Sequence, residues 1–165
     1  MLRIKCSFLS AIIASLFFVI LPVSKVLSQT LPSFQMQLAN GQTYTSKNVL
    51  PAKPLVLIYF APDCDHCTIL MDAIFKKIDQ FKSSQIVMVT FKPLDEVVDF
   101  EKHYQTSKYQ NIKVGTEKPM FYFKNYYQLV NTPFTALYDK KGKLIASYKK
   151  ETPVDELIRQ LKMIK

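Results

Sequence analysis

The chain has 165 residues, 48% of them hydrophobic, and a formal net charge of +9. This length favours one compact domain, and the sequence contains no internal repeat and no low-complexity tract. The positive charge is diffuse: Lys140, Lys141 and Lys143 surround Gly142 in an expected hairpin turn. Lysines spread in this way are typical of a solvated surface, so we expect no nucleic-acid partner.

The first 28 residues have the layout of a secretory signal peptide. Arg3 and Lys5 precede an uncharged stretch of 14 residues over 8–21. An uncleaved membrane anchor is the alternative, but a membrane-spanning helix needs roughly 20 residues. We therefore expect residues 1–28 to be removed on export to the periplasm or another extracytoplasmic space.

Cleavage leaves a single domain over residues 29–165. The signal carries three basic residues and no acidic one, so the mature chain is less basic. Cys6 is removed with the signal, and Cys64 and Cys67 are the cysteines that remain. An exported chain with one close cysteine pair is not a scaffold held together by disulfides.

The mature chain is expected to begin with a β-hairpin and a buried strand. Residues 34–45 alternate in polarity around Asn40-Gly41, a common hairpin turn. Residues 54–60 (PLVLIYF) form a continuous apolar run, which is typical of a strand buried on both faces of a sheet. After a break at Pro62, apolar residues recur every three or four positions and predict a helix over about 64–81.

Strands and helices alternate in the middle of the chain. Residues 85–91 are expected to form a second buried strand, and residues 94–104 a helix. The polar stretch 105–118 has no clear pattern. A short helix is expected within residues 119–130, with Pro119 in its first turn.

The chain is expected to end with a β-hairpin and a helix. The strands FTALYD and KLIASYK are joined across Lys140-Lys141-Gly142, and residues 153–164 form the last helix, with Thr152 as its N-cap. This order of elements predicts an α/β fold in which helices sandwich a mixed β-sheet.

Cys64 and Cys67 form a Cys-x-x-Cys motif at the start of the first predicted helix. Unpaired N–H groups and the positive end of the helix dipole favour a thiolate at this place. Cys64 is therefore the expected nucleophile. Cys67 lies about one helical turn further on and can resolve the mixed disulfide that Cys64 forms.

The residues next to the motif are expected to tune it. A protonated His66 stabilises the Cys64 thiolate and makes the couple more oxidising. Asp63 and Asp65 act in the opposite direction through like-charge repulsion, although the helix N-terminus also favours their carboxylates. The opposing effects argue against an extreme oxidant.

Other uses of the cysteine pair fit the sequence less well. A closed zinc site needs four ligands, and covalent haem attachment needs a histidine where Thr68 stands, so neither is expected. A disulfide that closes so short a loop is a poor structural staple. The alternative that stays open is a binding module or a chaperone for a soft ion such as Cu(I), with His103 as the one histidine outside the motif.

Three segments resemble the thioredoxin fold and, more closely, the exported TlpA/ResA-like branch of thiol-disulfide oxidoreductases. FQMQLANGQTY is similar to the N-terminal hairpin of that branch, and KPLVLIYFAPDCDHC to its central strand and active site. VNTPFTALYDKKGKLIASY is similar to its cis-proline segment and the hairpin that follows. The resemblance covers roughly residues 34–161 and implies a thioredoxin-like fold with an N-terminal β-hairpin and a central insertion within about residues 105–130.

The resemblance also implies roles for individual residues. Cys64 matches the nucleophile and Cys67 the resolving thiol. Pro133 matches the cis-proline and Thr132 the residue before it, where the backbone binds substrate. The implied enzyme is a monomer without cofactor that exchanges disulfides with protein thiols and exchanges electrons with a membrane redox partner.

The sequence departs from typical thioredoxins at two places. Asp63 stands where they have a tryptophan, and Ile58 stands at the position of their buried acid on the central strand. Ile58 cannot relay a proton, so Asp63, Asp65 or water must handle the proton during resolution.

The expected insertion is rich in aromatic side chains between Phe121 and Tyr127. Core packing is the favoured interpretation. An aromatic rim that grips a partner beside the active site is the alternative. The aromatic residues of the stretch are Phe121, Tyr122, Phe123, Tyr126 and Tyr127.

Overall fold

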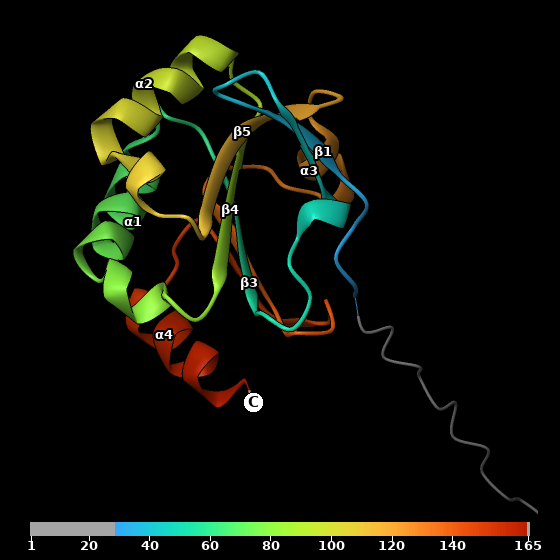
Figure 1. Cartoon of the computed structure of the whole chain (residues 1–165), viewed down its shortest axis with the longest axis vertical. Helices are drawn as coiled ribbons and strands as arrows, with labels where there is room; N and C mark the ends of the chain where they lie inside the picture. The colour runs from blue at the N-terminus through green and yellow to red at the C-terminus, as the bar shows by residue number, and fades with distance from the viewer. Residues whose placement is uncertain (1–28, 165) are drawn as a thin grey trace, which may run out of the picture.

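The computed structural model describes residues 29–164 and shows a seven-stranded sheet packed between helices (Figure 1). The predicted signal over residues 1–28, including Cys6, lies outside the described residues. The strands are β1 (Gln35–Leu38), β2 (Thr43–Thr45), β3 (Leu55–Phe60), β4 (Gln85–Thr90), β5 (Ile112–Lys118), β6 (Phe134–Tyr138) and β7 (Leu144–Lys149). The α-helices are α1 (Asp65–Lys76), α2 (Leu94–Tyr104), α3 (Tyr122–Tyr126) and α4 (Val154–Met163).

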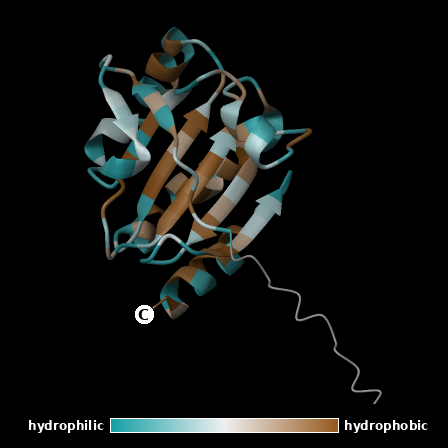
Figure 2. Cartoon of the chain, turned by 90° about the vertical axis from the view of Figure 1, so that its right-hand side faces the viewer, coloured by the Kyte–Doolittle hydropathy of each residue, from teal (hydrophilic) through white to brown (hydrophobic). Residues whose placement is uncertain are grey.

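The sheet is mixed, as predicted, with the strand order β2-β1-β5-β4-β3-β6-β7. At the centre, Ile58 of β3 pairs in parallel with Met88 of β4 and antiparallel with Thr135 of β6. The two predicted hairpins form the two ends of the strand order, β1–β2 and β6–β7. The central strands are the most apolar part of the sheet (Figure 2).

Successive side chains of β3 enter two separate cores, because neighbours on a strand point to opposite faces. Val56 and Ile58 pack in the core shared with α1, α2 and α4. Leu57 and Tyr59 pack in the second core, which includes Phe123 of α3. Three helices thus cover one face, and α3 covers the other (Figure 1). All four β3 side chains are buried, as the apolar run predicts.

Strand β5 occupies the stretch that gave no clear sequence pattern. It lies between β4, to which it is parallel, and β1, to which it is antiparallel. Ile112 and Val114 are buried in the helix-covered core, but Gly115 and the buried acid Glu117 fall on the opposite face. A glycine and an acid at inward positions conceal the alternation that identifies a strand.

Gly115 allows β1 and β5 to approach closely. A Cβ atom at this position would lie 2.6 Å from the Gln37 backbone oxygen and 3.1 Å from Cγ of Met36. We expect Gly115→Ala to lower the free energy of unfolding by about 1–3 kcal/mol, the usual cost of overpacking. Urea denaturation measures this, with Gly41→Asn as the control, because a Cβ atom at Gly41 would have nothing within 4 Å and asparagine tolerates its φ of +80°. Equal losses in both variants would contradict the close approach.

Two helix boundaries differ from the predicted ones. The backbone leaves the α region at Lys77, and the turn that follows is a short 3-10 helix, Ile78–Phe81, so the first helix is shorter than predicted. The N-cap of α4 is Pro153, and the prediction of Thr152 was wrong. The Thr152 hydroxyl instead forms a 2.8 Å hydrogen bond with the Thr135 hydroxyl of β6.

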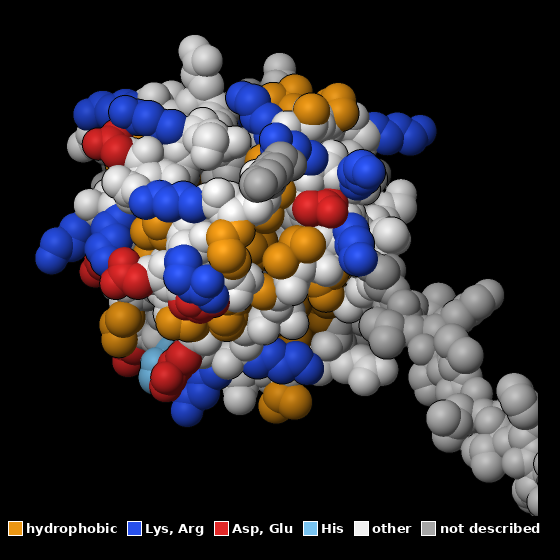
Figure 3. All heavy atoms as spheres, turned by 90° about the horizontal axis from the view of Figure 1, so that it is seen from below, with side chains coloured by type: hydrophobic (Ala, Val, Ile, Leu, Met, Phe, Trp, Pro, Cys, Tyr) orange, Lys and Arg blue, Asp and Glu red, His pale blue; other side chains and the backbone are white. Residues whose placement is uncertain are grey.

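Charged side chains are spread over the surface. On the face shown in Figure 3, lysine and arginine side chains lie around hydrophobic ones and do not form a continuous stripe. Within residues 29–164, no helix is long and apolar enough to cross a membrane.

Candidate active site

The cysteine motif lies at the turn from the central strand β3 into α1. The Cys64 N–H donates to the Ala61 carbonyl (3.2 Å), which closes the turn. Cys64 is the N-cap of α1 with an extended backbone, and its carbonyl accepts the N–H groups of Cys67 (2.9 Å) and Thr68 (3.0 Å). Both cysteines are thiols in this structure. Cys64 is half-buried, whereas Cys67 is 1% exposed.

The structure brings Thr132 and Pro133 to Cys64, from which Thr132 is separated by 68 positions. The Cys64 thiol donates to the Thr132 carbonyl, with 3.6 Å between Sγ and the oxygen. The Thr132–Pro133 bond is cis, and the Pro133 carbonyl accepts the N–H of Lys150 (2.8 Å). The start of β6 is thereby held against the first turn of α1.

The two thiols differ in proton affinity. Burial raises the pKa of Cys64, but hydrogen bonds from the side chains of Cys67 and Thr132 and from the N–H groups of Cys67 and His66 outweigh burial and hold the pKa below its ordinary value of 9.0. Burial raises the pKa of Cys67 to about 12. Cys64 is therefore the thiol that ionises first and is also the more accessible one.

The three residues expected to tune the couple occupy different surroundings. Asp63 forms an ion pair with Lys92, and the hydrogen bond from that lysine lowers the Asp63 pKa. Asp65 lies exposed in the first turn of α1. His66 is also exposed and lines two cavities, one beside Cys64 and one between α1 and residues 150–154. The pairing of Asp63 makes it a weak proton acceptor for Cys67.

A groove of about 620 Å³ lies beside Cys64. We call it the Cys64 groove. Its wall includes the predicted site residue Thr132 and two residues of the insertion, Phe121 and Lys124. Val130 and Lys150 also line it. The sequence indicated the cysteines and Thr132, but not the lysines.

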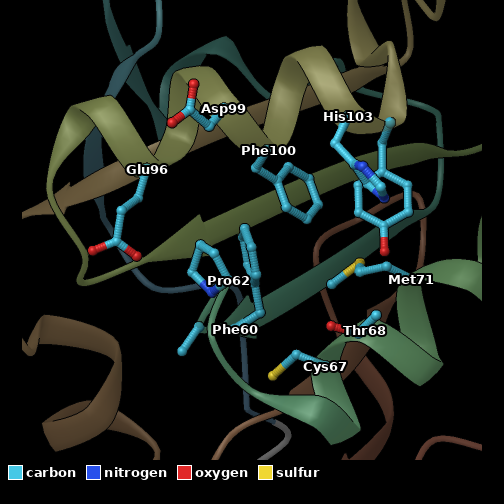
Figure 4. Close-up of a pocket in the computed structure, with 11 residues that line it drawn as sticks. Phe60, Pro62, Cys67, Thr68, Met71, Glu96, Asp99, Phe100 and His103 are labelled. Atoms are coloured by element: carbon cyan, nitrogen blue, oxygen red, sulfur yellow. The ribbon is translucent and has the colours of Figure 1, made fainter.

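A second cavity, of about 290 Å³, opens at Cys67 between α1 and α2 (Figure 4). Phe60 and Phe100 give it apolar walls. Glu96 and Asp99 of α2 line it as well. The buried Cys67 thiol thus borders a cavity that carries two carboxylates.

The aromatic residues of the insertion have divided roles. Phe123 (0% exposed) and Tyr127 (8%) belong to the core, in agreement with the favoured interpretation. Phe121 is 38% exposed and packs on Phe91 with 5.3 Å between ring centroids, at the wall of the Cys64 groove. Pro119 precedes α3 and is not in its first turn, because the N-cap is Phe121.

Sequence reasoning missed Glu117, a buried acid under the groove. Its Oε1 accepts the Tyr59 hydroxyl and the Phe121 N–H, and its Oε2 accepts the Phe123 N–H, each at 2.8 Å. Burial raises the Glu117 pKa despite these hydrogen bonds. Glu117 fastens the start of α3 to β3 and so fixes the position of Phe121. No local pattern distinguishes it from a surface acid.

We expect Glu117→Gln to lower the free energy of unfolding by about 1–3 kcal/mol, because the amide N–H₂ of glutamine replaces one acceptor and leaves a buried donor unpaired. Urea denaturation measures the loss, with the exposed Glu151→Gln as the control. Equal stability of the two variants would show that the hydrogen bonds to Glu117 do not hold α3.

The fold and the position of the cysteine pair are those of a thioredoxin-like protein. A family model described as the AhpC/TSA family matches residues 27–163, so the chain belongs to this family. No curated protein matches the chain significantly. The family match confirms the predicted redoxin-type family and supports the predicted enzyme class, a thiol-disulfide oxidoreductase.

Solved structures confirm the thioredoxin-like fold. The exposed lipoprotein thioredoxin Etrx1 of Streptococcus pneumoniae has a TM-score of 0.61 at 20% identity, covering 80% of this chain and 99% of its own. Peroxidoxin BcpB of Mycobacterium tuberculosis has a TM-score of 0.70 at 14% identity, covering 84% and 97%. DsbF of MTB has a TM-score of 0.64 at 17% identity, covering 80% and 95%.

Proposed function

We propose that the protein is an exported, TlpA/ResA-like thiol-disulfide oxidoreductase that exchanges disulfides with other proteins through Cys64 and Cys67. The observation that carries the proposal is the asymmetry of the two thiols. Cys64 is accessible at the N-terminus of α1 with a lowered pKa, and Cys67 is buried on the same helical turn with a raised pKa. Such a pair suits attack by one thiol and resolution by the other.

The exchange proceeds in two steps. The Cys64 thiolate attacks one sulfur of a substrate disulfide; that disulfide breaks, and the leaving thiolate takes up a proton. Cys67 then loses its proton and attacks the Cys64 sulfur, which releases the second substrate thiolate. The substrate gains two electrons, and Cys64 and Cys67 end as a disulfide. The reverse steps oxidise substrate thiols, and a membrane redox partner resets the couple.

The proton of Cys67 needs an acceptor other than a buried acid, because Ile58 occupies the middle of β3. The cavity at Cys67 supplies one route. Water in this cavity reaches the thiol, and the carboxylates of Glu96 and Asp99 on its wall stabilise a proton that moves outward.

Thr132 supplies a backbone edge for an extended substrate. Its carbonyl faces the Cys64 sulfur, and its N–H has no hydrogen-bond partner among residues 29–164. A substrate strand can pair with this edge through its backbone, as in β-strand addition, and this pairing does not depend on the side chains of the substrate. Pro133 has no N–H and leaves Thr132 as the docking residue.

The alternative is a soft-metal chaperone that uses the same cysteines together with a further ligand beside them. In the part of the chain that the structure describes, no group of three or more His, Cys, Asp and Glu side chains is placed to hold a metal ion. His103 lies on α2 and lines the cavity at Cys67, but it forms no such group with the cysteines.

A single-turnover reaction tests the proposal. The reduced protein is mixed with an equimolar protein disulfide, quenched with an alkylating reagent and analysed by mass spectrometry. We expect substrate thiols to appear as Cys64 and Cys67 become resistant to alkylation. Absence of transfer in both directions, from reduced protein to disulfide and from oxidised protein to dithiol, would contradict the proposed function.

A further inference from the structure

The Cys64 groove combines exposed apolar side chains with cationic ones. We propose that it selects substrate segments in which an acidic side chain and apolar residues flank the reacting cysteine. The inference rests on the proposed function and names the substrate class of the same site.

Two apolar side chains that line the groove are exposed to solvent. Val130 is 84% exposed, and Phe121 is 38% exposed. Phe91 and Leu129 complete the apolar wall that leads to Cys64. Burial of such side chains against a partner stabilises a complex, and exposed apolar patches of this kind mark interaction sites.

The charged part of the groove is cationic. Lys124 and Lys150 both line it, and none of the lining residues is acidic. The Lys124 ammonium lies 5.4 Å from the Phe121 ring centroid, so it is held over the apolar wall. The backbone of Lys150 is fixed by its N–H donation to the Pro133 carbonyl.

The acids that neighbour Cys64 and Lys150 in the sequence do not pair with these lysines. Across residues 29–164, neither Lys124 nor Lys150 forms an ion pair. Asp63, next to the motif, pairs instead with Lys92. Glu151 follows Lys150 in the sequence, and both line the neighbouring cavity between α1 and residues 150–154, but among residues 29–164 they form no ion pair with each other.

The complementary ligand is therefore a carboxylate beside apolar side chains. An extended protein segment fits better than a small disulfide, because the Thr132 backbone edge and the apolar wall provide contacts beyond the reacting sulfur. A carboxylate within reach of Lys124 or Lys150 gains a favourable charge contact. A lysine at the same place meets like charge, which disfavours binding.

The test uses peptides of equal length with one cysteine activated as a 2-pyridyl disulfide. Leucine flanks the cysteine, and the next positions carry aspartate, asparagine or lysine. The rate of reaction with Cys64 is measured by release of the pyridine thione at low salt. Each rate is divided by the rate with neutral dipyridyl disulfide, which removes any change in the reactivity of the thiolate itself.

We expect the acidic peptide to react about tenfold faster than the basic one, since two partly exposed charge contacts together approach 1.4 kcal/mol. Lys124→Glu with Lys150→Glu should reverse this preference, and 0.5 M salt should weaken it. The matched control is Lys140→Glu with Lys141→Glu, in the turn at the other end of β6, which should keep the wild-type preference.

Different results distinguish a failure of the proposed function from a failure of the proposed charge selection. If no peptide forms a mixed disulfide with Cys64, the proposed function itself fails. If all peptides react at the same normalised rate, or if the reversal at positions 124 and 150 leaves the preference unchanged, the charge selection is wrong. The mixed 2-pyridyl disulfide of glutathione reacting faster than every peptide would overturn the assignment of an extended protein segment.

Discussion

Cys64→Ser should abolish disulfide exchange, whereas Cys67→Ser should accumulate mixed disulfides with substrate proteins. The difference arises because, of the two cysteines that the structure describes, Cys64 is the accessible one that can attack a substrate, and Cys67 is the one placed to release it. Non-reducing gels and mass spectrometry of the two variants, incubated with an oxidised substrate protein, measure the trapped species.

The double variant, Cys64→Ser with Cys67→Ser, is the control for nonspecific adducts and should trap nothing. The opposite pattern, with mixed disulfides in Cys64→Ser and none in Cys67→Ser, would reverse the assignment of nucleophile and resolving thiol.

The two thiols should also titrate far apart. In Cys67→Ser, alkylation of Cys64 should rise with an apparent pKa below 9.0. In Cys64→Ser, Cys67 should form its thiolate only well above pH 9.0, because its burial persists. Since the lower pKa gives Cys64 more thiolate at pH 7, and Cys67 is also buried, Cys64 should be alkylated about tenfold faster or more at that pH.

Iodoacetamide labelling followed by mass spectrometry gives both pH profiles. Labelling in denaturant is the control, because unfolding removes the burial and the hydrogen bonds and should bring the two rates together. If the folded variants titrate at the same pH, the difference between the two thiols does not come from the fold.

Sequence patterns were sufficient to predict the elements that are determined by neighbouring residues. The apolar run that became β3 is buried on both faces, and the repeat in α2 gave its bounds, Leu94–Tyr104, directly. Asn40-Gly41 gave the first hairpin for the same reason, since turn residues act through their own backbone. The Cys-x-x-Cys motif was recognisable because a strand, a break and a helix surround it.

Features that depend on contacts between distant segments could not be predicted from local sequence patterns. Glu117 is buried because β5 inserts between β4 and β1, and its partners come from β3 and α3. Lys124 and Lys150 meet at one groove only after folding. The place of Pro133 beside Cys64 was available from resemblance to a family, not from the residues around Pro133.

The central claim is that Cys64 and Cys67 form a reversible redox couple. Equilibration of the protein in glutathione buffers of graded ratio, followed by alkylation and mass spectrometry, tests it most directly. We predict one two-electron transition with the same midpoint from the reduced and the oxidised side, at which both thiols are lost together. A pair that never reoxidises, or thiols that change independently, would contradict the account.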